Sequence, residues 1–341
     1  MKRFVIVAVL FAAVVWLLNT SLLATPPEGP PKILAHRGIH QTYPKAGVGN
    51  DTCTAEIIEK PRHDHLENTV ASMQAAFDAG AAVVELDIHL TPDRQFAVFH
   101  DWTFDCRTEG KGVTEETPMT VLKSLDIGYG YTADGGKTFP FRGKGTGQMP
   151  TLEEVFTALP VRQFLVNFKS RRAEEGAALA ALLETHPEWR QAVFGVYGGG
   201  EPTREALKLV KGLRGYDRNS VVGCLARYVA YGWTGVVPAA CQNTLVIVPG
   251  NYAPWLWGWP DRFAQRMKSA GSEIILLGPY AGGDFTTGID SAEDLELVPE
   301  NFSGYVWTNR AEMIGLMLAK RQPASYSAAR LIRRAKVAAA L

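Results

Sequence analysis

Short apolar runs alternate with helical patterns along most of the chain, and this alternation constrains the fold more than any other feature. Val, Ile and Phe concentrate in the runs, as they do in strands that are buried on both faces. We predict strands at residues 33–36, 82–90, 96–100, 164–169, 192–197, 220–225, 244–248, 273–277 and 304–308.

Helical patterns occupy many of the intervals between the predicted strands. In residues 68–80, for example, Val70, Met73 and Phe77 lie on one helical face, and Gly80 marks the end of the helix. Repeated βα units predict a parallel sheet, and about eight of them predict closure of that sheet. We therefore predict an α/β fold of the TIM (β/α)8 barrel type.

One barrel accounts for most of the length. The chain has 341 residues, of which 46% are hydrophobic, and this content excludes a disordered chain. An α/β barrel uses about 250 residues, and we assign it to residues 32–320, with inserted loops at 39–66 and 128–147 and a basic tail at 321–341. The 35 basic residues balance the 35 acidic ones, so no global positive field favours a nucleic acid. We infer no protein partner.

The N-terminus has the pattern of an export signal. Two basic residues precede an uncharged run at 4–18. Continued through Ala24, the apolar stretch reaches about 21 residues, enough to cross a bilayer of about 30 Å. Leu22 would stand at the −3 position of a cleavage site after Ala24, where a small residue is usual. We therefore expect residues 1–24 to be an uncleaved signal anchor, with a cleaved signal peptide as the alternative.

Either alternative places the rest of the chain outside the cytoplasmic membrane, in the periplasm or another extracytoplasmic space. Residues 25–31 contain four prolines and form a stiff spacer. In such a compartment the four cysteines are potential disulfide partners. Of the three pairings, we favour Cys53 with Cys106 and Cys224 with Cys241. Four buried free thiols are the alternative.

Residues 83–90 have two different faces when they are read as a strand. One face is apolar, and the other carries Glu85, Asp87 and His89. In a barrel the apolar face packs under the helices, which directs Glu85 and Asp87 inward. Two inward carboxylates repel each other unless a cation or a shared proton relieves them. Hard oxygen ligands favour Ca²⁺ or Mg²⁺, and a salt-bridged structural pair is the alternative.

Further polar side chains stand where predicted strands end. His36 and Arg37 end the first strand, His100 ends the third, and Asn167 and Lys169 share the inward face of the fourth. Catalytic groups of α/β barrels gather at the carboxyl ends of the strands. Cations that hold phosphoryl oxygens, beside imidazoles that move protons, suit a phosphate ester. Each histidine taken alone is equally compatible with a structural role.

These residues belong to an ordered set of motifs that resembles the glycerophosphodiester phosphodiesterase family. The set runs from residue 33 to residue 169 and fades beyond it, although residues 307–310 resemble the last barrel strand of the family. The resemblance implies a TIM barrel, a bound Ca²⁺ or Mg²⁺, and hydrolysis of glycerophosphodiesters to sn-glycerol 3-phosphate and an alcohol. The motifs are His36-Arg37-Gly38, Glu67-Asn68-Thr69, Glu85-Leu86-Asp87, His100-Asp101 with Arg107-Thr108-x-Gly110-x-Gly112, Leu125-Asp126 and Pro150-Thr151-Leu152.

The resemblance also implies a role for each matching residue. His36 and His100 become the acid/base pair, either one serving as acid, and the nucleophile is water or the free hydroxyl of the glycerol. Arg37 and Lys169 become phosphate binders, Glu85 and Asp87 metal ligands, and Glu67 and Asn68 supporting residues.

One position departs from the family pattern. Asn167 stands where the family usually has a glutamate that ligates the metal. An amide oxygen can ligate Ca²⁺ but brings no charge, so we expect Asn167 to be a weak third ligand and the metal affinity to fall. Compensation by Glu67 or water, and loss of turnover, are the alternatives.

Three tryptophans suggest a head-group contact. Trp255, Trp257 and Trp259 follow a predicted strand, and we hypothesise a cage or platform for a choline-type head group or a lipid surface. Ordinary packing is the alternative. A second possible function is a phospholipase D-like enzyme for lysophospholipids or sphingolipids. Such an enzyme needs a lipid-binding mouth, which these tryptophans could supply. A third possible function is the binding of phosphodiesters without catalysis, because Asn167 prevents the site from holding the metal.

Overall fold

The structure is a nearly closed barrel of eight parallel strands surrounded by helices. This computed structural model describes residues 2–25, 28–45, 47–49, 52–282 and 287–321. The order of strands around the barrel is β6-β5-β4-β2-β1-β9-β8-β7, and the predicted TIM barrel is confirmed. The strands are β1 (Lys32–His36), β2 (Ala81–Leu90), β3 (Phe96–Val98), β4 (Phe164–Phe168), β5 (Val193–Gly198), β6 (Gly215–Tyr216), β7 (Leu245–Pro249), β8 (Glu273–Leu277) and β9 (Tyr305–Thr308).

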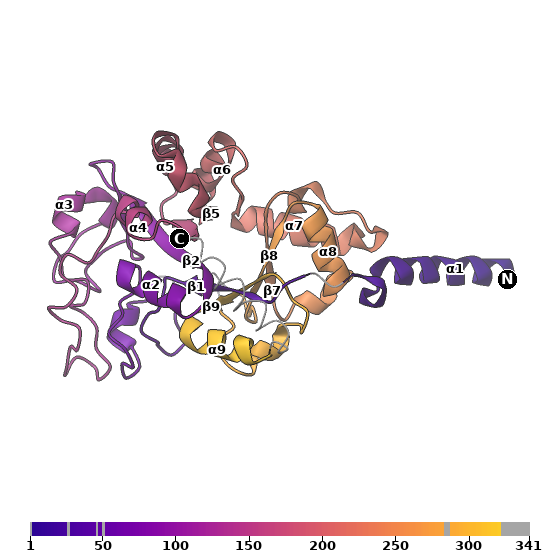
Figure 1. The fold of residues 1–341 in the computed structure, drawn as a ribbon, viewed down its shortest axis with the longest axis horizontal. Coiled ribbons are helices and arrows are strands. Elements are labelled where there is room, and N and C mark those ends of the chain that lie inside the picture. The colour runs from indigo at the N-terminus through magenta and orange to yellow at the C-terminus, as the bar shows by residue number, and fades with distance from the viewer. Residues whose placement is uncertain (1, 26–27, 46, 50–51, 283–286, 322–341) are drawn as a thin grey trace, which may run out of the picture.

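Helices form a ring around this sheet, as Figure 1 shows for α4 to α9. At the edge where the barrel nearly closes, the Thr244 hydroxyl donates a hydrogen bond of 2.7 Å to the Gly215 carbonyl, which links the start of β7 to β6. The helices are α1 (Lys2–Asn19), α2 (Val70–Asp78), α3 (Met119–Leu122), α4 (Leu152–Ala158), α5 (Ala173–Thr185), α6 (Gly200–Leu209), α7 (Arg218–Tyr231), α8 (Asp261–Ser269) and α9 (Ala311–Arg321).

One predicted strand is wrong. Residues 220–225 lie in helix α7, and the barrel strand of this region is the two-residue β6 that precedes it. The Asp217 side chain accepts a hydrogen bond from the Ser220 amide, and the Ser220 hydroxyl accepts one from the Asp217 amide. This capping box starts a helix at the point where the apolar run had indicated a strand.

The segment predicted as a strand at 96–100 is β3, but β3 is not part of the barrel. It pairs antiparallel with the end of β2, with Ile88 opposite Val98 and Leu90 opposite Phe96. The connection between β2 and β3 is too short for the crossover that a parallel pair needs. His100 therefore follows a hairpin arm that folds back over the barrel and does not follow a barrel strand.

The two faces of β2 contact different cores, as the alternation in the sequence predicts. Leu86 and Ile88 belong to the large apolar cluster between the sheet and the helices. Val83 belongs to a smaller cluster inside the barrel, together with residues such as Leu34 and Trp307. Glu85, Asp87 and His89 extend this inner face, and all three are fully buried. The inner cluster closes one end of the barrel, so the polar side chains lie at the other end.

Both predicted disulfides form. Cys53 joins Cys106 with Cα atoms 5.6 Å apart, and this bond ties the loop after β1 to the loop after β3. Cys224 of α7 joins Cys241, and here the Cα atoms are 4.9 Å apart. The first bond packs against a separate apolar cluster under these two loops, so the insertions have a core of their own.

Helix α1 projects from the barrel beside α8 (Figure 1). It has 18 residues, none of them buried. Within the part of the chain that the structure describes, it is the one helix that is long and apolar enough to cross a membrane. Residues 26 and 27 of the predicted spacer and residues 322–341 of the predicted tail lie outside the described residues.

Candidate active site

Two buried carboxylates form the floor of the site. Parallel pairing places Glu85 of β2 opposite His36 of β1, and Asp87 of β2 opposite Asn167 of β4. The carboxylates lie two residues apart on one strand, so their side chains point to the same side. Neither side chain is accessible to solvent.

Four partly exposed side chains surround this floor. Their exposed fractions are 13% for His36, 10% for Arg37, 15% for His100 and 17% for Lys169. His36 and Arg37 come from the end of β1, Lys169 from the end of β4, and His100 from the arm that follows β3. The structure therefore brings the two predicted histidines and the two predicted phosphate binders to one mouth of the barrel.

A sharp turn after β1 directs Arg37 over the floor. Arg37 has a φ of 55°, a left-handed conformation that costs a non-glycine residue about 1 kcal/mol. Its amide lies 3.0 Å from the Glu85 carbonyl and 3.1 Å from Glu85 Oε2. At the next residue φ is 80°, and a Cβ atom on Gly38 would lie 2.3 Å from Ser72 Oγ. Only glycine fits there, which explains the His-Arg-Gly sequence.

The Arg37 guanidinium is paired but retains a free donor. Nη1 lies 3.1 Å from Glu67 Oε1, and Nε lies 3.2 Å from Asp87 Oδ2. The second contact lacks hydrogen-bond geometry, so this buried Nε–H has no acceptor among the described residues. A buried donor without an acceptor is costly, and a phosphoryl oxygen at the mouth would satisfy it.

Donors already occupy both oxygens of Asp87. Oδ1 accepts a hydrogen bond of 2.8 Å from the Asn167 amide and lies 3.7 Å from Lys169 Nζ. Oδ2 accepts a hydrogen bond of 2.9 Å from the Asn68 amide, in addition to the contact with Arg37. Asn167 therefore acts as a donor to Asp87, and its own oxygen faces Gly198, where an added Cβ would lie 2.1 Å away.

This donor set does not fit the divalent cation predicted for Glu85, Asp87 and Asn167. A cation would have to displace two amide groups and approach two positive side chains, and the third side chain brings no charge. Among the described residues, no group of three or more His, Cys, Asp or Glu side chains is placed to hold a metal. Ca²⁺ or Mg²⁺ stays a prediction from the family resemblance.

A proton relieves the repulsion between the two carboxylates. Burial, followed by the charge of Asp87, raises the pKa of Glu85 to about 8. Burial alone would also raise the pKa of Asp87, but Lys169 and Arg37 hold it well below its usual value. At neutral pH Glu85 is therefore mostly protonated and Asp87 is charged. The Tyr197 hydroxyl lies 2.7 Å from Glu85 Oε1 and fixes its orientation.

The two histidines have different partners. His36 Nδ1 lies 2.6 Å from Asn309 Oδ1, and because an amide oxygen can only accept, the proton of neutral His36 is on Nδ1. Asn309 is held in turn by Asp290, whose Oδ2 accepts from the Asn309 side-chain amide at 2.8 Å. Burial and the charge of Arg37 lower the pKa of His36 well below its usual value, so His36 is neutral with a free lone pair on Nε2.

His100 has a carboxylate as its partner. Its Nδ1 lies 2.6 Å from Asp101 Oδ1, and Asp101 Oδ2 accepts from Arg107 Nε at 2.8 Å. Burial and the charges of Arg37 and Lys169 lower the pKa of His100, whereas the hydrogen bond to Asp101 opposes this change. Of the two imidazoles, His100 is the one with a hydrogen-bonded carboxylate, a partner that favours the protonated ring, although its pKa stays below the usual value.

Glu67 connects the two halves of the site. It accepts from Arg37 on one side and lies 3.3 Å from Arg107 on the other. Burial opposes its ionisation, but Arg107 and Arg37 lower its pKa. The two residues predicted as possible supports both contact the site, Glu67 through Arg37 and Asn68 through Asp87.

The sequence did not identify three residues of the site. Tyr197 occupies an inward position on β5, and Asn309 and Asp290 lie at the end of β9 and in the loop before it. Periodicity gives the inward position of Tyr197 but no role for it. The partner of His36 is 273 residues away along the chain, a distance at which no spacing rule applies.

The predicted head-group cage is not assembled. Trp257 and Trp259 pack against the outer core, and the Trp257 indole donates to the Val229 carbonyl at 2.8 Å. Trp255 is exposed, and no ring contact among the described residues joins it to the other two. Ordinary packing, the alternative, describes Trp257 and Trp259.

Comparisons with known proteins find similarity over the segment that contains most of this site. A model of the glycerophosphoryl diester phosphodiesterase family matches residues 36–178. A glycerophosphodiester phosphodiesterase of Caldanaerobacter subterraneus is 38% identical over 103 residues, which are 30% of this chain and 39% of the relative. The chain spans less than half the length of the first curated relatives that it matches.

Solved structures share the fold. A glycerophosphodiester phosphodiesterase of Agrobacterium tumefaciens has a TM-score of 0.56 and 19% identity, covering 84% of this chain and 99% of its own. A phosphodiesterase of Oleispira antarctica, solved with the product sn-glycerol-3-phosphate, has a TM-score of 0.52 and 18% identity, covering 85% of this chain and 97% of its own.

The segment matched by the family model contains both histidines, the two cations of the mouth and the buried carboxylates. It is also the segment in which the ordered motifs of the sequence were found. Residues 36–178 of the chain, with the candidate site inside them, therefore match the glycerophosphoryl diester phosphodiesterase family.

Proposed function

We propose that this chain hydrolyses glycerophosphodiesters to sn-glycerol 3-phosphate and an alcohol, with His36 and His100 as the acid/base pair. One observation carries the proposal: the partly exposed groups at the mouth are two cations and two imidazoles, and they surround a common buried floor. Cations suit a phosphodiester anion, and imidazoles suit proton transfer near neutral pH.

The substrate phosphate binds between Arg37 and Lys169. Arg37 offers its unpaired Nε–H, and Lys169 offers a partly exposed ammonium 3.7 Å from Asp87. Asp87 contacts both cations and Glu67 also contacts Arg37 before the substrate arrives, so little reorganisation accompanies binding. As the bond to the leaving group lengthens, these two charges stabilise the additional negative charge on the phosphoryl oxygens.

His36 is the general base and His100 the general acid. Nε2 of His36 takes a proton from water, whose oxygen forms a bond to phosphorus. The bond from phosphorus to the alcohol oxygen breaks, and Nε2 of His100 protonates that oxygen. Asn309 keeps the lone pair of His36 on Nε2, and Asp101 stabilises the protonated form of His100. If the glycerol hydroxyl attacks first, the same two residues act and a cyclic phosphate forms before water opens it.

Helix α1 and the disulfides support a proposal about the location of the chain. We propose that α1 remains attached and anchors the barrel on the outer side of the cytoplasmic membrane. Its two basic residues at the start favour the cytoplasmic side for that end. Two disulfides with no free cysteine left are consistent with an oxidising compartment.

The proposed activity is tested with the full chain in detergent micelles. Glycerophosphocholine and glycerophosphoethanolamine are incubated with Ca²⁺, Mg²⁺ or EDTA, and glycerol 3-phosphate is measured. We expect release that falls by about 10²-fold or more in His36→Ala and in His100→Ala. His186→Ala, at an exposed histidine outside the site, is the matched control and should match the wild type. No release in any sample, or release that survives both site substitutions, contradicts the proposal.

A further inference from the structure

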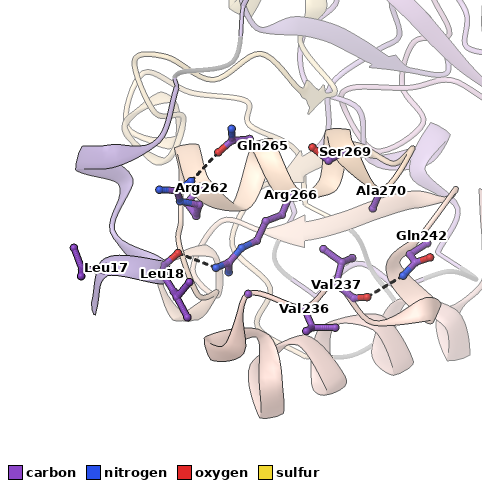
Figure 2. A pocket seen from close by; sticks show the side chains of 11 residues that line it. Leu17, Leu18, Val236, Val237, Gln242, Arg262, Gln265, Arg266, Ser269 and Ala270 are labelled. Carbon is purple, nitrogen blue, oxygen red and sulfur yellow. Dashed lines mark hydrogen bonds between the residues drawn. The ribbon is translucent and has the colours of Figure 1, made fainter. Parts of the chain in front are cut away.

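A cavity lies where α1 meets the barrel, and it shares no residue with the candidate active site. Its volume is about 670 Å³. Figure 2 shows that its walls come from the end of α1, from the loop at 235–242 and from α8. A cavity of this size accommodates a group as large as a phospholipid head group with the start of its chains.

The cavity is positively charged. Arg262 and Arg266 of α8 line it, and none of the described lining residues is acidic. Neither arginine forms an ion pair with a carboxylate among the described residues. The remaining polar groups of the wall are uncharged, as in Gln242, Gln265 and Ser269. An anion entering this cavity therefore meets two uncompensated positive charges.

The two arginines are engaged to different degrees. Arg266 closes the end of α1, because its guanidinium donates to the Leu18 carbonyl at 2.8 Å and to Asn19 Oδ1 at 3.0 Å (Figure 2). Arg262 has one hydrogen bond, from Nη1 to Gln265 Oε1 at 3.1 Å. Its Nε is buried and has no acceptor among the described residues. Arg262 is therefore the donor that an anion in this cavity would satisfy.

The cavity also lies at the depth of lipid head groups if α1 crosses the membrane. The 18 residues of α1 measure about 27 Å at 1.5 Å per residue, close to the hydrocarbon thickness of about 30 Å. The boundary between hydrocarbon and head groups then falls near Leu18 and Asn19, at the wall of the cavity. Leu17, Leu18 and Val236 are 49%, 40% and 57% exposed there.

A short helix beside the cavity holds α1 against the barrel. Trp233 belongs to the short helix η5 (Gly232–Thr234), and its ring lies edge-on to Phe11 of α1 with the centroids 5.7 Å apart. Its backbone carbonyl accepts from the Asn19 side chain at 2.8 Å. Phe11 lies eight residues before Asn19, about 12 Å along the helix, so η5 packs along the second half of α1 and fixes the direction of α1 relative to the barrel.

We propose that this cavity binds the head group of an anionic phospholipid of the outer leaflet, with Arg262 as its principal contact. The proposal rests on the membrane anchor proposed above and adds a lipid site that the hydrolytic activity does not need. The phosphate lies against Arg262 and Arg266, and the acyl chains run along Leu17 and Leu18 of α1. The bound lipid would hold the barrel at a fixed orientation to the membrane.

Native mass spectrometry of the full chain, released from nanodiscs with equal amounts of phosphatidylcholine and phosphatidylglycerol, tests this site. We expect the wild type to retain phosphatidylglycerol over phosphatidylcholine, and Arg262→Gln to reduce that preference about fivefold. Lys268→Gln, which removes an exposed charge of the same helix outside the cavity, is the matched control and should keep it. Arg262→Gln is checked for unchanged hydrolysis of glycerophosphocholine, which shows that it folds.

A second variant does not depend on the partly buried arginine. Gln242 is exposed and lines the cavity, so Gln242→Glu adds a negative charge there without disturbing the core. This variant should also abolish the preference for phosphatidylglycerol over phosphatidylcholine. Equal retention of the two lipids by the wild type, or an unchanged preference in both cavity variants, overturns the site. Equal thermal stabilisation by inorganic phosphate and phosphatidylglycerol would show a free-anion site and overturn the lipid assignment.

The same samples separate this proposal from the others. A full chain that does not stay in the nanodiscs overturns the anchor and the lipid site together. A chain that stays but shows no lipid preference overturns the lipid site alone. Hydrolysis, measured in parallel, reports on the catalytic proposal independently of both.

Discussion

At the scale of single residues, Asn167 distinguishes this site from the family pattern. Its amide donates to Asp87 at 2.8 Å, in the position from which a carboxylate would face a metal. With Asn68 on the other oxygen of Asp87, the floor consists of one charged carboxylate surrounded by donors. The structure shows that asparagine at position 167 supplies a hydrogen-bond donor to Asp87, whereas the sequence alone indicated only that a negative charge is missing there.

Asn167→Glu should therefore create metal affinity. It removes a donor from Asp87 and adds a third carboxylate, which raises the attraction for Ca²⁺. We expect calorimetry to show Ca²⁺ binding at least about tenfold tighter than in the wild type, a gain of about 1.4 kcal/mol. Asn167→Gln, which has the same length as glutamate without its charge, should show no gain. Tight Ca²⁺ binding by the wild type itself would contradict the arrangement of donors described here.

The sequence predicted the side chains of the candidate site but not the more distant residues that form hydrogen bonds with them. His36, Arg37, Glu85, Asp87, His100 and Lys169 meet at one mouth, as strand alternation and the ordered motifs indicated. Asn309, Asp290 and Tyr197 were not found, because a hydrogen bond between distant segments leaves no periodic signal in either of them. The roles that we propose for the two histidines rest on these partners, which the sequence does not reveal.

At the scale of elements, the contact between α5 and β2 depends on a buried acid. The Glu175 side chain is fully buried, and its Oε1 accepts from the Leu90 amide at 2.8 Å. Oε2 has no partner among the described residues. Burial raises the pKa of Glu175 to about 7 from a usual value of 4.5, so the folded protein holds this proton more tightly than the unfolded chain does.

The free energy of unfolding should therefore fall as the pH rises from about 4.5 to about 7 and level off above that range, because only the unfolded chain releases the proton readily there. The loss attributable to Glu175 is on the order of 3 kcal/mol. Glu175→Gln keeps an acceptor for the Leu90 amide and removes the titration. Urea unfolding at several pH values should show a smaller pH dependence in this variant, and an unchanged slope would contradict the assignment.

The disulfide between Cys53 and Cys106 should contribute to both stability and activity. It closes a loop of 53 residues, worth about 4 kcal/mol by chain entropy, and Arg107, which holds Asp101 beside His100, follows it directly. The double variant Cys53→Ala/Cys106→Ala should unfold at lower urea and lose kcat. Cys224→Ala/Cys241→Ala, with a separation of 17 residues and about 3 kcal/mol, should lose stability with kcat retained. Equal effects on kcat would contradict this distinction.

The predictions of secondary structure were wrong in two places. In one place a helix cap decided the structure, and in the other the direction of the strand decided it. The apolar run at 220–225 indicated a strand, but the Asp217–Ser220 capping box makes it helical. The run at 96–100 is extended as predicted, yet β3 pairs antiparallel with β2, and a pattern of apolar residues does not encode direction. The other predicted strands are present because burial on both faces leaves a strong compositional signal.

At the scale of the whole molecule, a nearly closed barrel carries the candidate active site at its mouth and, on its side, a helix suited to a membrane. The cavity between α1 and α8 and the mouth of the barrel have no residue in common. The hydrolytic activity and the membrane attachment that we propose therefore use separate parts of the chain.

The proposed anchor predicts that α1 is retained in the mature protein. In membranes of a bacterium that expresses the full chain, intact mass measurement should show the N-terminal helix still attached, and alkaline carbonate should not extract the protein. The reason is Leu22, which fits the −3 position of a cleavage site poorly. A mature N-terminus near Thr25, together with a protein in the soluble periplasmic fraction, would contradict the anchor.

In the proposed mechanism His36 and His100 act on opposite sides of the phosphorus, as base and acid. The most direct test compares glycerophosphocholine with a glycerol phosphodiester of p-nitrophenol, whose leaving group needs no proton. We expect the loss of kcat that His100→Ala causes, relative to the wild type, to be about 10²-fold smaller with the p-nitrophenyl ester than with glycerophosphocholine. The losses of kcat that His36→Ala and Asn309→Ala cause should be the same with both substrates. Equal rescue of the His36 and His100 variants, or rescue of His36→Ala alone, would contradict this mechanism.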